Sequence, residues 1–127
     1  MQDLLEDIQE YFAVNLLFDK EAIFRDVALD KPDEAVILYE YEGSQGPPQI
    51  AGATRSVQVV VRSKSATRAK NKARELHRSL MTETGQVQLT AVRWSLIHLR
   101  QPPFKLKEDE EKRVYYCFNA GITTYID

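Results

Sequence analysis

Two helical hydrophobic patterns set among several strand patterns most constrain the fold of this 127-residue chain. Residues 2–15 repeat apolar side chains at helical spacing and carry acidic residues on the other face. Residues 65–81 predict a second helix, with Ser65 as its N-cap. Its narrow apolar stripe is suited to packing on a sheet and consists of Ala66, Ala69, Ala73, Leu76 and Leu80.

The other patterned segments are typical of β-strands. Ala35–Tyr41 is nearly continuously apolar, which predicts a strand covered on both faces, and Ile23-Phe24 suggests a shorter strand. Alternating patterns predict further strands at about 56–62, 86–90, 92–99 and 113–125. Without the short Ile23-Phe24 segment, the order is α, β, β, α, β, β, β, which predicts an α+β fold. We expect a two-layer sandwich with a mainly antiparallel sheet and two helices packed on one face.

Two breaks interrupt this pattern without dividing it into domains. Residues 42–55 contain three of the five glycines and two of the five prolines, which predicts a long loop. We expect this loop to be mobile in the free subunit and to become ordered against a partner. Gln101-Pro102-Pro103 is the second break, and Lys105–Lys112 is expected to form a charged tip. The sign of the charge changes abruptly within Glu108–Arg113, which is interpreted as a solvated hairpin tip. With no linker or repeat, residues 1–127 are expected to form a single domain.

Charge divides unevenly along the chain. Residues 1–55 carry twelve acidic and four basic side chains, whereas residues 56–127 carry seven acidic and thirteen basic. A small domain with two oppositely charged regions is suited to docking head to tail with a copy of itself or on a charged partner. No apolar run approaches the length of a membrane span, so a membrane is not an expected partner.

The predicted helices concentrate these charges. Arg62, Lys64, Arg68, Lys70, Lys72, Arg74 and Arg78 form a basic run, and Asp3, Glu6, Asp7 and Glu10 form an acidic helix face. The basic run is interpreted as a solvated face, a contact for an acidic protein surface, or a nucleic-acid contact. No aromatic side chains interleave the basic run as a base-stacking platform requires, which disfavours specific nucleic-acid binding. The candidate subunit or partner interface is therefore Arg68, Lys70, Lys72 and Arg74 with Asp3, Glu6, Asp7 and Glu10.

No motif indicates catalysis, a cofactor or a metal site. His77 and His98 lie on different predicted elements, and His98 shares a strand face with Trp94, which predicts an ordinary, partly buried histidine. Cys117 lies within a predicted strand and is interpreted as a small buried filler rather than a nucleophile. As the only cysteine, it cannot form an intrachain disulfide, which suits a reducing compartment. We therefore expect a protein that assembles with others rather than an enzyme.

The order of these segments resembles the small minor capsid proteins of long-tailed bacteriophages, which are similar in turn to tail terminator and tail-completion proteins. The resemblance runs nearly end to end. It is carried by Lys31-Pro32-Asp33-Glu34-Ala35-Val36, Tyr39-Glu40-Tyr41-Glu42-Gly43, Val57-Gln58-Val59-Val60-Val61-Arg62, Leu76-His77-Arg78-Ser79-Leu80, Gln101-Pro102-Pro103-Phe104 and Val114-Tyr115-Tyr116-Cys117-Phe118-Asn119.

The resemblance implies a structural virion protein without a cofactor. It implies an α+β subunit of a ring, with six copies, that caps the tail tube and joins the tail to the head connector. The implied partners are further copies of the chain, the tail tube protein and the head connector or stopper protein. The implied location is the virion neck, assembled in the cytoplasm of the host bacterium. The alternatives are another neck or head-completion protein and a nucleic-acid-binding accessory protein that uses the basic helix 65–81.

Overall fold

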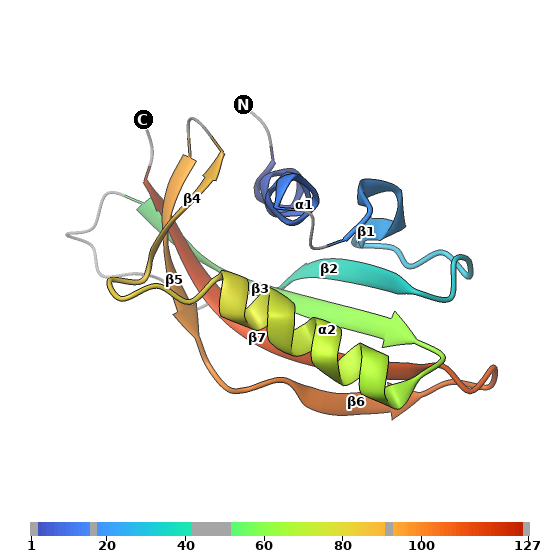
Figure 1. The fold of residues 1–127 in the computed structure, drawn as a ribbon. Helices are drawn as coiled ribbons and strands as arrows, with labels where there is room; N and C mark the ends of the chain where they lie inside the picture. Colours follow the sequence, from blue (N-terminus) through green and yellow to red (C-terminus); the bar gives the residue numbers. More distant parts are fainter. Residues whose placement is uncertain (1–2, 16–17, 42–51, 91–92, 126–127) are drawn as a thin grey trace.

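The computed structural model describes residues 3–15, 18–41, 52–90 and 93–125, and within them seven strands form one curled sheet (Figure 1). The strand order is β1-β2-β3-β7-β5-β4, and β6 pairs with β7. Only β1 and β2 are parallel; the other neighbouring pairs are antiparallel. The strands are β1 (Ile23–Arg25), β2 (Ala35–Tyr41), β3 (Gly52–Ser63), β4 (Gln86–Thr90), β5 (Arg93–Leu99), β6 (Phe104–Glu108) and β7 (Val114–Tyr125).

Two α-helices, α1 (Leu4–Val14) and α2 (Ala66–Ser79), and a short 3₁₀ helix, η1 (Lys20–Ala22), complete the described elements. The predicted N-cap is confirmed, because the Ser65 hydroxyl accepts a hydrogen bond from the Arg68 N–H at 3.2 Å. No helix in the described part of the chain is both long and apolar enough to cross a membrane.

The main core lies between the sheet and the two helices. Val57, Val59 and Val61 alternate along β3 and share one buried cluster with Phe118 of β7. Leu4, Leu5, Ile8 and Phe12 of α1 and Ala69, Ala73 and Leu76 of α2 belong to the same cluster. In Figure 1, α2 lies along β3 and β7 while α1 lies beside β1 and β2. The α+β class is confirmed, and the two-layer arrangement stays a prediction.

A smaller buried cluster lies on the opposite face of the sheet. It consists of Ile37, Val60, Tyr115 and Cys117, which alternate with residues of the main core. Ala35 to Leu38 are therefore all buried, which confirms that β2 is covered on both faces over its first half. The helical stripe is partly corrected, because Ala66 is exposed at the first turn of α2 whereas Ala69 and Ala73 are buried.

Three local predictions differ from the structure. The loop expected at 42–55 is too long, because Gly52 to Arg55 already pair with Tyr125 to Ile122 of β7; residues 42–51 lie outside the described residues. Residues 105–108, expected as part of a charged tip, belong to strand β6, because pairing with β7 supplies backbone partners that the exposed side chains do not reveal. His98 is exposed, because β5 directs Ser95 and Ile97 to the core instead.

Candidate interface surfaces

The outward face of α2 carries two sets of cations. Arg68 lies 2.9 Å from the Glu34 carboxylate, and Lys72 lies 3.0 Å from that of Glu75. Lys70, Arg74 and Arg78 are exposed and have no ion pair within the described residues. These three residues follow one another at intervals of four and span about 12 Å of helix. The uncompensated surface of α2 is therefore this stripe of Lys70, Arg74 and Arg78, which we call the basic stripe.

The basic run on the sequence does not continue into β3. Arg62 is only 2% exposed, and its guanidinium donates to the backbone carbonyls of Pro32 and Asp33. Strand alternation explains this, since Arg62 follows Val61 and therefore points to the face opposite the helices. Lys64 lies 3.5 Å from the Asp33 carboxylate. Arg62 is a structural side chain rather than part of a basic surface.

The acidic face predicted on α1 is largely compensated within the chain. Asp7 is only 2% exposed, so its prediction as a solvated face residue is wrong; its position beside Leu4 and Ile8 turns it inward. Glu6 pairs with Arg25 at 2.8 Å, and Asp3 lies 3.5 Å from Arg55. Glu10 is half-buried and also has an interaction. The contact of Asp3, Glu6 and Glu10 with a partner stays a prediction.

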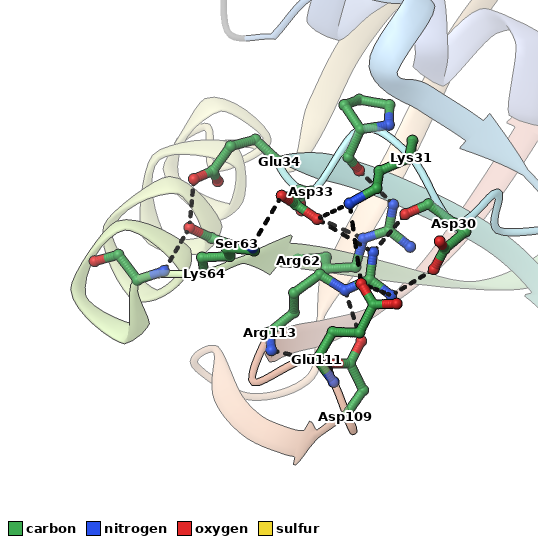
Figure 2. Close-up of polar contacts among 12 residues, drawn as sticks. Asp30, Lys31, Asp33, Glu34, Arg62, Ser63, Lys64, Asp109, Glu111 and Arg113 are labelled. Carbon is green, nitrogen blue, oxygen red and sulfur yellow. Dashed lines mark hydrogen bonds and ion pairs between the residues drawn. The ribbon is translucent and has the colours of Figure 1, made fainter.

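The most connected polar group in the structure is a charge cluster around Arg113 (Figure 2). This side chain is 5% exposed, and its Nε donates to Asp109 Oδ2 at 2.8 Å. Its Nη2 lies 2.9 Å from Asp30 Oδ1. Its Nη1 donates a hydrogen bond to the Asp30 carbonyl and lies 3.5 Å from Asp33 Oδ1. The cluster thus ties the segment before β2 to the turn between β6 and β7.

Asp109 organises that turn from the other side. Its carboxylate accepts hydrogen bonds from the N–H groups of Glu111 and Arg113 and from the Tyr115 hydroxyl, at 3.0, 2.9 and 2.9 Å. Burial alone would raise the pKa of Asp109, but these hydrogen bonds and the Arg113 charge outweigh it and lower the pKa to about 2. The abrupt change of sign at Glu108–Arg113 thus marks an ordered hairpin, and the predicted solvated tip is wrong for Asp109 and Arg113.

The same contacts stabilise the charged form of Arg113. Burial by itself would lower the pKa of this guanidinium, but hydrogen bonds to Asp109 and Asp30 raise the pKa overall. Asp109 and Arg113 are therefore both charged near neutral pH, so their ion pair persists there. The sequence signal for it was only the adjacency of opposite charges, which does not distinguish a buried pair from an exposed one.

The residues considered for catalysis remain apart. Cys117 is fully buried, which confirms its role as a filler, and burial raises the pKa of its thiol to about 11. His77 packs edge-on against Phe118 with ring centroids 5.1 Å apart. Burial lowers the pKa of His77, although the backbone of Gln101 opposes this shift. The described residues contain no group of three acidic, histidine or cysteine side chains suited to a metal ion.

A groove of about 360 Å³ lies between the end of α1 and β4. Its lining mixes acidic, aromatic, aliphatic and amide side chains and includes neither a cysteine nor a histidine: Glu10, Tyr11, Val14, Asn15, Gln88, Leu89 and Thr90. Over the described residues, the geometry therefore offers contact surfaces and an ordered charge cluster.

The comparison with protein families supplies the identity that this geometry leaves open. A family profile described as bacteriophage tail terminator protein matches residues 13–126. The match extends from the last turn of α1 past the end of β7 and includes both α2 and the charge cluster. No curated protein matches the sequence.

Proposed function

The chain belongs to the bacteriophage tail terminator family, and from this premise we propose that it is the subunit of a ring that ends the tail tube. Six copies close the ring, which stops growth of the tube and presents a surface to the head connector. The subunit is placed in the neck of the virion and assembles in the cytoplasm of the host. Its partners are its own copies, the tail tube protein and the connector or stopper protein. The match over residues 13–126 carries this proposal.

A closed ring of identical subunits needs two different contact surfaces on each subunit, because each copy meets its neighbours head to tail. The basic stripe of Lys70, Arg74 and Arg78 supports such a role, since it is exposed and uncompensated within the described residues. We propose that this stripe, with Arg68 and Lys72 at its margin, docks on an acidic surface of a neighbouring subunit or neck protein. Catalysis has no part in this function, in keeping with a structural family.

The mass of the protein bound to purified tail tubes tests the ring. We expect about six copies at one end of each tube. A monomeric free protein is compatible with this result, because association costs free energy through the ordering of side chains and loops. Electron micrographs of the same particles separate a terminator from another neck component, since a terminator lies directly on the tube. One or two copies per tube would contradict the ring.

The basic stripe also favours the alternative of nucleic-acid binding, since duplex DNA attracts clustered cations. A titration of duplex DNA with the purified protein at rising salt concentration distinguishes a protein contact of this stripe from nucleic-acid binding. We expect weak binding at low salt that disappears at moderate salt. Tight binding with a steep salt dependence, without assembly on tubes, would favour the accessory-protein alternative.

A further inference from the structure

One histidine is packed at the edge of the main core without a hydrogen-bond partner for its Nε2. His77 lies in the last turn of α2, directly after the fully buried Leu76. Its ring meets that of Phe118 edge-on, with centroids 5.1 Å apart and an angle of 89° between the ring planes. The Nε2 atom is buried and has no hydrogen-bond partner within the described residues. The ring therefore packs as an apolar aromatic side chain does, although it carries a nitrogen that can take up a proton.

The sheet side of this ring offers no counter-charge. On β7, the neighbouring side chains that face α2 are Tyr116 and Phe118, a phenol and a hydrocarbon. The connection from β5 to β6 brings the backbone of Gln101 close to the ring. Arg100, the only charged residue of that connection, turns away and donates to the Ser56 hydroxyl at 3.0 Å on the far face of the sheet. Within the described residues, a proton on the ring therefore meets no carboxylate from these elements.

The helix side surrounds His77 with cations. Arg74 lies three residues before it on α2, and Arg78 follows it directly. Glu75 lies on the other flank of the helix, where it pairs with a lysine at 3.0 Å. Lys105 of β6 is paired within its own strand at 3.8 Å. His77 makes no ion pair in the described part of the chain, so its protonation adds a charge among cations at a cost that burial increases.

Acidification opposes this packing. Burial lowers the pKa of His77 below its ordinary value of 6.5, and the Gln101 backbone offsets only part of that shift. The unfolded chain therefore takes up the proton first as the pH falls. The stability that the neutral ring contributes is complete above about pH 6.5 and decreases as the pH falls toward the lowered pKa. Asp109 loses its contribution only below about pH 4, so the two groups act in separate pH intervals.

We propose that His77 is a pH-dependent switch with two side-chain positions. In the neutral form the ring packs on Phe118; in the protonated form it swings outward to solvent and joins the basic stripe as a fourth cation. The position of His77 on α2 allows this movement, because the residue is half-buried at the margin of the packed side of the helix. It follows Lys70 by seven residues and Arg74 by three, which places it beside the stripe.

The switch couples proton uptake to docking on the basic stripe, and this step rests on the docking role proposed above. A fourth cation strengthens the contact with an acidic surface. In return, an acidic partner on the stripe favours the protonated, outward ring, because the two effects are reciprocal. Mild acid therefore destabilises the free subunit and favours the docked one.

Nuclear magnetic resonance of the free protein tests the movement of the ring. The chain contains two histidines, so the imidazole signals are assigned with single variants. Between pH 7.5 and pH 5, the Overhauser contact between the rings of His77 and Phe118 is expected to disappear as His77 titrates. The amide signals of β3 and β7 are expected to stay native. A contact that persists in the protonated form overturns the switch.

Thermal midpoints test the cost of the proton. As the pH falls from 7.5 to 5, His77→Gln is expected to gain about 2–4 °C relative to the native protein, because its side chain does not titrate. His77→Phe, which keeps an aromatic ring without the nitrogen, is expected to show the same gain. His98→Gln removes the exposed histidine and is the matched control, with the pH dependence of the native protein. An equal pH dependence of the native protein and both His77 variants overturns the switch.

Assembly on tail tubes tests the coupling to docking. At low salt, the amount of tail-bound native protein is expected to rise about threefold or more between pH 7.5 and pH 5.5, whereas that of His77→Gln stays constant. An equal rise in both proteins overturns the coupling. Normal assembly of a variant with glutamate at positions 70, 74 and 78 would overturn the docking role of the basic stripe. The movement of the ring is measured on the free protein and does not depend on that result.

Discussion

At the scale of single residues, Arg113 links the segment before β2 to the turn between β6 and β7. It is a long, charged side chain in a nearly buried position, and such positions are tolerated only when the charge is paired. The pairing is extensive, because the planar guanidinium donates along separate directions to Asp109 and Asp30. The side chain consequently joins segments that are far apart along the chain and leaves no buried donor unused.

Replacing Arg113 tests this account. Arg113→Met leaves Asp30 and Asp109 without the guanidinium that they share, and we expect a loss of about 2–3 kcal/mol in the free energy of unfolding. Arg113→Lys keeps the charge but not the forked geometry and is expected to recover only part of that loss. Urea unfolding at pH 7 measures both variants. A methionine variant as stable as the native protein would mean that the cluster does not stabilise the fold.

The pKa of Asp109 predicts a dependence on pH. Because its pKa in the folded protein is about 2 and lies below the usual 3.8, the unfolded chain binds the proton more readily. The stabilisation from Asp109 is therefore complete above about pH 4 and is lost as the pH falls toward 2. Asp109→Asn is expected to be less stable than the native protein at pH 7, and the difference should shrink across that interval.

Thermal midpoints of the native protein and Asp109→Asn, measured between pH 7 and pH 2, check this dependence. Glu110→Gln serves as the control, because Glu110 is an exposed carboxylate in the same turn. A difference between Asp109→Asn and the native protein that stays constant down to pH 2 would contradict the assigned role of the carboxylate.

At the scale of elements, α2 shows how one helix serves two purposes. Its buried side is made of small residues, Ala69 and Ala73, that let the helix lie close to β3 and β7, while Leu76 fills the space further along. Its opposite side carries the basic stripe of Lys70, Arg74 and Arg78. Because the two sides are separate, charges on α2 can be changed with little effect on the core.

Replacing Lys70, Arg74 and Arg78 together with glutamate is expected to weaken assembly on tail tubes by at least tenfold at low salt. Single exposed pairs contribute only about 0–1 kcal/mol each, so the effect is cumulative and decreases as salt is added. The thermal midpoint should stay nearly unchanged. Asn71→Glu, which adds an acid to the same helix without removing a cation, is the control. Normal assembly of the triple variant would show that the stripe is merely solvated.

At the scale of the whole molecule, both helices and strands from every part of the sheet except β6 contribute to a single main core. Tyr11 adds a polar link between the helices, because its hydroxyl donates to the Ser79 carbonyl at 2.8 Å. No helix is therefore expected to unfold independently of the sheet.

Leu76→Ala tests this cooperativity. Leu76 is fully buried on α2, and its truncation is expected to lower the free energy of unfolding by about 2–5 kcal/mol. Far-ultraviolet circular dichroism and tyrosine fluorescence should report the same transition for the variant and for the native protein. Loss of helical signal before the loss of tertiary signal would show that α2 is an independent unit.

Local patterns were sufficient to predict much of this architecture. Helical spacing along α1, the Ser65 cap and the valine alternation of β3 depend on neighbouring residues alone, so the α+β class followed from them. Cys117 was identified as buried for the same reason, since it lies within an alternating strand. The resemblance to tail terminator proteins likewise rested on the order of such segments.

The burial and the partners of individual charged side chains were decided by the tertiary structure. Asp7, Arg62 and Arg113 appear in the sequence as members of charged surfaces, yet each is buried because the fold brings other segments against it. The backbone of β6 became a strand only because β7 lies beside it, which its own exposed side chains do not indicate. Periodicity acts between neighbours in sequence, whereas ion pairing and strand pairing act between segments distant in sequence. The amino-acid sequence alone thus determined the class of fold and the family, while the positions and partners of the charges required the folded molecule.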